Sequence, residues 1–350
     1  MKKSLLILLM TALVMALIFS GCAKPAPTEA ITLKYNDQNP EVGWSAQHAA
    51  KPILREMEKA TGGKIKFEEY FGQTLSKGAD AWEATKAGIA DDSWCFHGYW
   101  PGLTPLADVI SLPFMPFESA EQASGIFWKL YEKFPSLSAQ FDDNKILFVW
   151  TSTPYFIINS KKEIRTLEDL QGLKLRVTGG PPTDMMKLLG ASPMLVGMPD
   201  TYVNIQKGVI DGMLIPWEAI YTFKQYEVVK YYTYVPTVTV YFSNAMNWDA
   251  WNGLPSDVQE QIMSVGSLKG STFYGKNMFD TIAEEARKVI KEEGYPMIEY
   301  TIPPDELQRW TEVAGEPLWE EWVKAMEAEG HTEARDILNT TQQLIKTYKP

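Results

Sequence analysis

Arg176 is the residue in this chain whose type is best suited to bind an anion. It lies in the stretch LQGLKLRVTGG, residues 170–180, where apolar side chains alternate with Lys174 and Arg176. This alternation predicts a strand that ends at glycines and has one apolar face. A guanidinium can hold a carboxylate through two parallel hydrogen bonds. Most strands have one solvated polar face, however, so the spacing alone favours an Arg176 that merely faces water.

The other residue types that support catalysis are scarce or badly spaced. The sequence contains no H-E-x-x-H, G-x-S-x-G or G-x-G-x-x-G motif, and its three histidines, His48, His97 and His331, would all have to converge to form a histidine metal cluster. The segment GSTFYGKN, residues 270–277, approaches a phosphate-binding loop, but Asn277 stands where Ser or Thr would bind magnesium, and its surroundings predict helix. We therefore expect no catalytic residue, no metal and no cofactor.

Length and composition indicate a globular protein of two domains. The chain is 45% hydrophobic and 12% aromatic, so it can bury a sizeable core. Its length of 350 residues exceeds what one core usually fills. The formal net charge is −11, and no block of Lys and Arg could neutralise phosphates. Nucleic acid is excluded as a partner on these grounds.

The first 30 residues predict export. Lys2 and Lys3 precede an apolar run that ends at Phe19 and is shorter than the ~18 residues expected of a membrane span. Residues 1–21 are therefore interpreted as a signal peptide. The following Ser-Gly-Cys22 looks like the lipobox of bacterial lipoproteins, although Phe19 stands where that motif usually has Leu.

Acylation of Cys22 would make residues 22–30 an extended tether to the membrane, because acyl chains anchor through their buried CH2 groups. The alternative is ordinary signal cleavage, with Cys22 a bystander. Cys95 is the only other cysteine, so the mature chain can form no intrachain disulfide, and we expect this thiol to be buried.

The mature chain alternates strand and helix patterns, which predicts an α/β sheet. A helix over residues 46–57 is stopped by Gly62 and Gly63, and Pro52 indicates a kink or a late start. The predicted strands are 31–35, 64–69, 89–96, 145–150 and 155–159, a second helix covers 78–87, and helix formers dominate 305–348 with a break near residue 330.

Several stretches in a fixed order resemble the solute-binding proteins of tripartite ATP-independent periplasmic (TRAP) transporters, the DctP-type family. The resemblance rests on EKATGGKIKFEEYFGQTLSKGADAWEATKAGIAD, then YWPGLTPLADVISLPF, then TLEDLQGLKLRV and finally LLGASPMLVGMPDTYVNIQKGVIDGM. It covers nearly the whole mature chain. Each fragment alone is weak, but their order over some two hundred residues is specific.

The resemblance implies an α/β periplasmic-binding-protein fold, in which two lobes close over a ligand in a central cleft and long helices end the chain. We assign residues 31–151 and 241–282 to the first lobe, 152–240 and 283–310 to the second, and 311–350 to C-terminal helices. The implied partners are a small organic acid and the TRAP permease in the membrane, and we expect a monomer.

The resemblance also implies that Arg176 pairs with a ligand carboxylate, which reverses the interpretation from spacing alone. Two departures from the family pattern describe the rest of the ligand. A second arginine is replaced around Pro154 and Tyr155, and the polar pair that usually precedes Pro216 is replaced by an apolar run ending at Ile215. Unpartnered polar groups are costly to bury, so the site should suit one carboxylate on an aromatic or bulky apolar body.

The remaining candidate contacts each have a structural alternative. Aromatic rings could stack on the ligand or pack in the core, His97 could bind ligand or be a hydrogen-bonded structural residue, and Glu218 could accept a ligand hydroxyl or amine or face solvent. Asn39 and Gln73 follow the first two predicted strands, where α/β sheets present ligand contacts. With Arg176, the candidate contacts are Trp217, Tyr155, Trp94, His97, Asn39, Gln73, Glu218, Ile215 and Tyr241.

The predicted function is capture of an organic monocarboxylate outside the cytoplasm for a TRAP permease. A dicarboxylate or sugar-acid binder of the same family, or a subunit that presents the ligand to a sensor, are the alternatives within this fold. An enzyme is the alternative of a different class.

Overall fold

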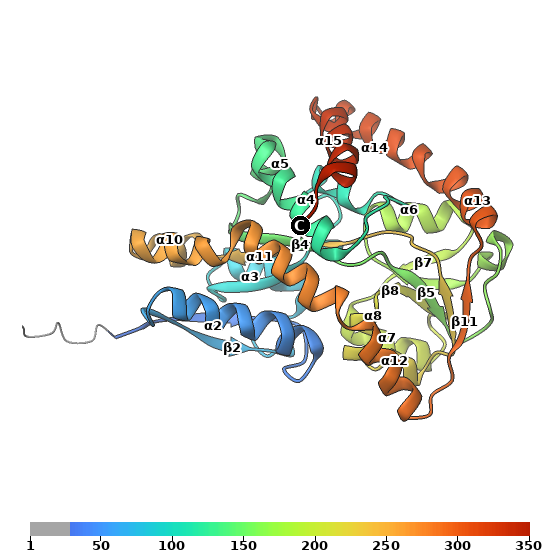
Figure 1. Ribbon diagram of the computed structural model, residues 1–350, viewed down its shortest axis with the longest axis horizontal. Coiled ribbons are helices and arrows are strands. Elements are labelled where there is room, and N and C mark those ends of the chain that lie inside the picture. Colours follow the sequence, from blue (N-terminus) through green and yellow to red (C-terminus); the bar gives the residue numbers. More distant parts are fainter. Residues whose placement is uncertain (1–28) are drawn as a thin grey trace, which may run out of the picture.

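The computed structural model describes residues 29–350, and the predicted signal peptide and Cys22 lie outside this part. Two β-sheets with their helices form two lobes that lie side by side (Figure 1). Among residues 29–350, no helix combines the length and the apolar character that a membrane span requires.

The first sheet has the strand order β2-β1-β3-β10-β4. Strand β10 runs antiparallel to both of its neighbours, whereas β1 is parallel to β2 and to β3. The strands are β1 (Ile31–Asn36), β2 (Ile65–Tyr70), β3 (Asp92–Phe96), β4 (Lys145–Thr151) and β10 (Tyr241–Met246).

The second sheet has the order β11-β9-β5-β8-β6-β7. Here β5 is the strand that runs antiparallel to its neighbours, and β6 is parallel to β7 and β8. The strands are β5 (Phe156–Asn159), β6 (Lys174–Val177), β7 (Ser192–Leu195), β8 (Gly212–Ile215), β9 (Tyr231–Tyr234) and β11 (Ile298–Thr301).

Helices accompany both sheets. Those of the first lobe are η1 (Ala46–Ala50), α2 (Lys51–Ala60), η2 (Gly78–Asp80), α3 (Ala81–Lys86), η3 (His97–Tyr99), η4 (Ala107–Ser111), α4 (Ala120–Lys133), α5 (Pro135–Ser138), η5 (Ala139–Phe141), α9 (Trp248–Asn252), α10 (Ser256–Val265), α11 (Ser267–Tyr274) and η9 (Gly275–Asp280). Those of the second are η6 (Leu167–Leu170), α6 (Pro181–Leu188), η7 (Met198–Asp200), α7 (Thr201–Gln206), α8 (Trp217–Thr222), η8 (Gln225–Glu227) and α12 (Ala283–Glu292).

The chain ends in α13 (Pro304–Ala314), α14 (Glu316–Ala328) and α15 (Ala334–Thr347), which cover both lobes (Figure 1). Helix α13 packs on α6 and η6 of the second lobe, and α15 packs on α4 and η4 of the first.

The predicted helix over residues 46–57 begins as the π-helical turn η1 and continues as α2. Pro52 lies in the first turn of α2, where the missing backbone N–H costs least, so it marks a late start of the regular helix. Gly62 follows with φ of 63°, in the left-handed region that glycine tolerates. The strand predicted to begin at residue 89 begins at Asp92.

Two chain segments that pass between the lobes are hydrogen-bonded to each other. Residues 152–155 connect β4 to β5, and residues 235–240 connect β9 to β10. The amide of Ser152 donates to the Val240 carbonyl at 2.9 Å, and the amide of Tyr155 donates to the Val238 carbonyl at 2.7 Å. Each crossing segment leads directly into an antiparallel strand, which is β5 after residues 152–155 and β10 after residues 235–240. A third passage is the helical run from α11 through η9 to α12 (Figure 1).

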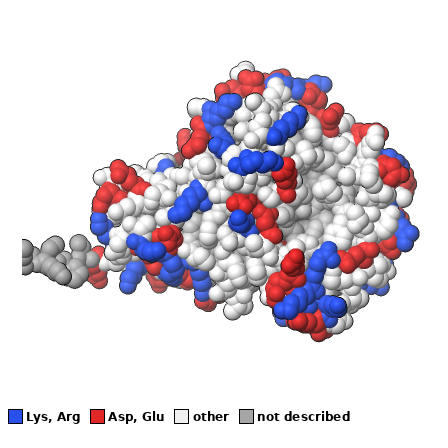
Figure 2. All heavy atoms as spheres, viewed as in Figure 1, with Lys and Arg blue, Asp and Glu red and all other residues white. Residues whose placement is uncertain are grey.

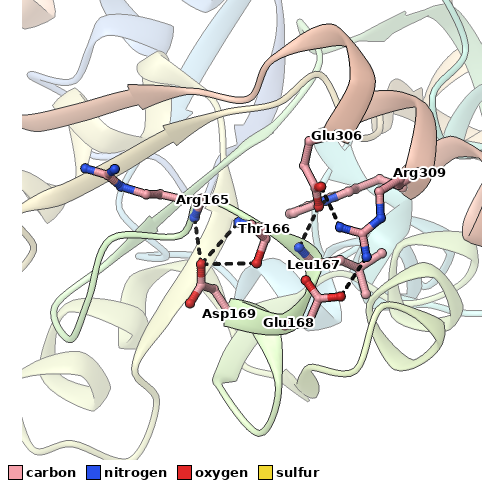
Figure 3. A network of polar contacts seen from close by, with 8 residues as sticks. Arg165, Thr166, Leu167, Glu168, Asp169, Glu306 and Arg309 are labelled. Atoms are coloured by element: carbon pink, nitrogen blue, oxygen red, sulfur yellow. Dashed lines mark hydrogen bonds and ion pairs between the residues drawn. The ribbon is translucent and has the colours of Figure 1, made fainter.

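A polar network fixes the segment that leads into β6 (Figure 3). Thr166 and Asp169 form a reciprocal capping box at the start of η6, in which the Thr166 amide donates to Asp169 at 3.1 Å. Arg309 of α13 bridges Glu168 and Glu306, each at 2.6 Å. The strand that carries Arg176 is thus approached through a segment held by the C-terminal helices.

Charged side chains of both signs are interspersed over the face of the molecule drawn in Figure 2, without a large patch of one sign.

Candidate functional site

A cavity lies where the two lobes meet. Its empty volume is about 350 Å³, which includes space that is open to solvent. The first lobe contributes Gln38, Asn39, Trp94, Phe96, Phe242, Met278 and Phe279, and the second lobe with the crossing segment contributes Tyr155, Arg176, Met198, Pro216, Glu218, Ala219 and Phe223.

Arg176 lies on β6 with only 2% of its surface exposed. Its Nε donates to the Val196 carbonyl at 3.0 Å, which orients the guanidinium. A guanidinium has five N–H donors, and within residues 29–350 no carboxylate lies within ion-pair distance of this one. A buried guanidinium with spare donors in a cavity has the geometry to hold an anion such as a carboxylate.

Glu218 is the second buried ionisable group of the cavity, with 2% of its surface exposed. It lies in the first turn of α8, and the Thr222 hydroxyl donates to its Oε1 at 2.7 Å. Burial raises the pKa of Glu218 to about 7, against the lowering effects of the Thr222 hydroxyl and the Ser45 backbone amide. The negative charge of Asp37 adds to the rise, so protonation of this carboxyl is much easier than that of an exposed glutamate.

The wall on the side of the first sheet is aromatic. The ring of Phe242 lies 5.0 Å from both Trp94 and Phe96 and 5.7 Å from Phe279, measured between ring centroids. The indole N–H of Trp94 has no hydrogen-bond partner within residues 29–350. Such a wall offers ring faces and edges to an apolar ligand body.

Tyr155 and Asn39 line the cavity as well. Tyr155 stands in the crossing segment, and burial raises the pKa of its hydroxyl. Asn39 donates both its backbone amide and its side-chain amide to Asp37, each at 2.8 Å. Burial raises the pKa of Asp37 to about 7. Of the ten predicted contacts, the cavity thus brings together Arg176, Tyr155, Trp94, Asn39 and Glu218.

His97 and Tyr241 lie together on the opposite side of the first sheet. Their rings stack at 5.2 Å, the His97 Nε2 is 2.9 Å from the Ser243 hydroxyl, and Tyr241 donates to Asp108 at 2.8 Å. Burial lowers the pKa of His97 to about 3, so the ring is neutral. The structure therefore gives both residues structural partners away from the cavity.

Trp217, Ile215 and Gln73 also stand apart from the cavity lining. The Trp217 ring lies 4.7 Å from the guanidinium carbon of Arg287, and Ile215 is fully buried in the core of the second lobe. Gln73 accepts a hydrogen bond from the Gly78 amide at 2.9 Å and folds back on its own loop.

The sequence prediction missed nine lining residues, namely Gln38, Phe96, Met198, Pro216, Ala219, Phe223, Phe242, Met278 and Phe279. Several are immediate neighbours of predicted residues, as Phe242 is of Tyr241 and Pro216 is of Ile215 and Trp217. At these positions the prediction found the correct segment but chose the neighbouring side chain, which faces away from the cavity. Met278 and Phe279 lie in the π-helical turn η9, which no periodic pattern predicts.

Contacts between the lobes flank the cavity. The Tyr99 hydroxyl donates to Gln38 at 2.9 Å and accepts from the Met198 amide of the second lobe at 3.1 Å. The Gly179 amide donates to the Gly98 carbonyl at 3.0 Å. A Cβ on Gly98 would clash with the Phe96 ring of the same lobe and would lie 2.9 Å from the Cβ of Thr178 in the other lobe, so both contacts favour glycine here.

Within residues 29–350, no group of three or more His, Cys, Asp or Glu side chains is placed to hold a metal ion. Cys95 is a free, buried thiol in β3. The site's chemistry is therefore that of one guanidinium, one carboxyl and a set of rings.

Two solved structures are similar to this chain over nearly its whole length. A TRAP solute-binding protein from Rhodoferax ferrireducens in complex with copurified benzoate is 28% identical, with a TM-score of 0.85 over 91% of this chain and 98% of that one. A marine metagenome TRAP solute-binding protein specific for aromatic acid ligands, in complex with 3-hydroxybenzoate, is 27% identical, with a TM-score of 0.85 over 92% and 100%. Both confirm the fold of two lobes.

Curated relatives are similar at lower identity. The 2,3-diketo-L-gulonate-binding periplasmic protein YiaO of Escherichia coli is 24% identical over 72% of this chain and 77% of its own length. The chain spans about half the length of two further relatives that it matches. Residues 42–325 match the family described as bacterial extracellular solute-binding protein, family 7, also called DctP. The chain therefore belongs to this DctP family of solute-binding proteins.

Proposed function

We propose that this protein captures an organic monocarboxylate with an aromatic or bulky apolar body and delivers it unchanged to a TRAP permease. The observation that supports this most is Arg176, a buried guanidinium whose Nε alone is bonded, to a backbone carbonyl, among the described residues. A ligand carboxylate would supply the missing partner through two parallel hydrogen bonds.

The apolar character of the ligand follows from what surrounds Arg176. Tyr155 lines the cavity around the position where the resemblance places a second arginine in related proteins, and Met198, Pro216 and Ala219 add apolar surface to the same wall. The aromatic wall offers stacking surface instead of hydrogen bonds. Benzoate and 3-hydroxybenzoate in two similar proteins support the same class of ligand.

A sugar acid or dicarboxylate is the second candidate. It is favoured by the similarity to a diketogulonate-binding protein and by polar groups of Gln38 and Asn39 in the cavity wall. A role in presenting the ligand to a sensor would use the same site. Co-purification with a membrane permease would support transport.

We also propose that the exported protein is a monomer anchored to the membrane through an acylated Cys22. The sequence Ser20-Gly21-Cys22 after an apolar run supports this. Cys22→Ser should move the protein from the membrane fraction to the soluble fraction. An N-terminal mass without acyl groups in the wild-type protein would contradict the anchor.

The ligand class is tested first by native mass spectrometry of the purified protein, which should show a small carboxylic acid. Calorimetry then compares benzoate and its derivatives with branched-chain keto acids, C4-dicarboxylates and sugar acids. We expect aryl acids to bind most tightly and without chemical conversion. Tight binding of a dicarboxylate or sugar acid, with no response to aryl acids, would overturn the proposed ligand class.

A further inference from the structure

Arg176 and Glu218 are two buried groups of opposite charge type in one cavity, and they do not pair with each other. No ion pair joins them, although each has 2% of its surface exposed. Burial is the main reason why the pKa of Tyr155 is raised, and Arg176 (which lowers it) and Glu218 (which raises it) both act on the same hydroxyl to a smaller extent. The two groups therefore lie within electrostatic reach of one hydroxyl, on different parts of the cavity wall.

Glu218 retains unused capacity for hydrogen bonds. A carboxylate has about four acceptor positions. The described residues provide Glu218 with the Thr222 hydroxyl at 2.7 Å and, weakly, the backbone of Ser45. The remaining positions belong to a carboxyl that lines the cavity. A buried acceptor without a partner is costly, so a ligand that satisfies it gains affinity over one that does not.

We infer that Glu218 is a specificity-determining residue, which receives a hydrogen bond from a hydroxyl group on the ligand body while Arg176 holds the carboxylate. The inference rests on the proposed function and narrows it to hydroxylated aryl acids.

A hydroxyl group fits Glu218 better than other polar substituents. It can donate to an ionised carboxyl and accept from a protonated one, and burial places the pKa of Glu218 at about 7, where both forms exist. An ammonium group would bring a second buried positive charge beside Arg176, and a second ligand carboxylate would face Glu218 with like charge.

The test compares four ligands on three proteins by calorimetry. Benzoate is compared with the three hydroxybenzoate isomers, on the wild type, Glu218→Leu and Glu218→Gln. In the wild type, the affinity for the best isomer should exceed that for benzoate by about tenfold or more. This ratio is the one expected of a hydrogen bond to a charged group. Glu218→Leu should bring this ratio close to one, because the ligand hydroxyl loses its hydrogen-bond partner.

Glu218→Gln keeps the volume of the side chain and serves if the Leu variant does not fold. It should reduce the ratio partly, because a neutral amide oxygen is a weaker acceptor. Glu284→Gln is the control for a lost negative charge, since Glu284 lies in the outer groove beside Trp44 and Tyr221. It should leave the ratio unchanged.

The outcomes separate the inference from the proposed function. If aryl acids bind and lose affinity in Arg176→Ala, but the hydroxyl ratio is the same in wild type and Glu218 variants, only the inference is wrong. A wild type that prefers benzoate would also overturn it. If no aryl acid binds the wild type, the proposed ligand class fails and the inference fails with it.

Discussion

The two walls of the cavity are made of different chemistry. The wall of the first lobe is a cluster of rings, with Trp94, Phe96 and Phe242 in mutual contact. The wall of the second lobe contains Arg176 and Glu218, both almost fully buried. Each wall can recognise a different part of the ligand, so full affinity requires both lobes. A ligand that contacts both walls stabilises the closed arrangement by its preference for that state.

The largest effect is expected from removing the cation of the second wall. Arg176→Ala should reduce carboxylate affinity by about thirty-fold to several thousand-fold, because a buried charge pair loses one partner. Arg176→Lys should restore little, since an ammonium lacks the planar two-bond geometry. Calorimetry with the tightest aryl acid measures both.

Lys174 provides the control for this comparison. It lies on the same strand, two residues away, and donates to the Gly208 carbonyl at 3.1 Å outside the cavity. Lys174→Ala should change affinity by less than about threefold, as expected for a remote charge. Equal losses of affinity in the two variants would show that positive charge alone, and not the two-bond geometry of the Arg176 guanidinium, binds the ligand.

A buried acid, Asp92, lies on the same strand as two rings of the aromatic wall. Its raised pKa predicts that the protein becomes less stable as pH rises toward 8. Asp92 lies on the same face of β3 as Trp94 and Phe96, and its carboxyl is fully buried with only weak contacts, to the Asn244 side chain and the Ser93 backbone. Burial raises the pKa of Asp92 to about 8. The folded state therefore holds a proton that the unfolded chain releases above about pH 4, so this contribution to stability is lost as pH rises toward 8.

Asp92→Asn removes that titration. Relative to the wild type, the variant should gain free energy of unfolding as pH rises from 5 to 8, by up to about 1.4 kcal/mol per pH unit. Urea unfolding at the two pH values measures the gain, and Glu284→Gln is the exposed control. An Asn variant that is equally destabilised at both pH values would show that Asp92 is ionised in the fold.

A smaller effect is expected from the rings of the first wall. Phe242→Leu keeps an apolar side chain but removes a ring that contacts three other rings of this wall. Affinity for aryl acids should fall by about twofold to tenfold, while that for branched aliphatic keto acids should change less. If both ligand classes weaken equally, the wall acts through shape alone and stacking is not its contribution.

The smallest effect on binding is expected at Trp217, whose ring lies against Arg287 and stacks on Tyr232 at 5.9 Å. Trp217→Ala should cost about 1–3 kcal/mol of stability and change aryl-acid affinity by less than about threefold. Thermal unfolding and calorimetry on the same sample separate the two readouts. A strong loss of binding at unchanged stability would place this ring at the ligand after all.

The fold was predictable because strand and helix patterns alternate and the family motifs occur in order. The place of Arg176 in the cavity lining was predictable because it lies in the segment LQGLKLRV, which resembles a motif of the family. The other site residues depended on which of two successive side chains faces the cavity, and a strand reverses this with every residue. Tyr241 and Phe242 show the consequence, since one binds Asp108 on the far face and the other lines the cavity. Periodicity locates a strand but does not say which face the ligand will use.

The paired crossing segments determine how the lobes can move. Because 152–155 and 235–240 are joined by backbone hydrogen bonds, they form a narrow ribbon that bends easily but resists sliding of one strand along the other. Tyr155 belongs to this ribbon and also lines the cavity. A ligand in contact with this ring would therefore act directly on the connection between the lobes. Substitutions at this pivot should shift the resting angle between the lobes while both walls keep their own chemistry.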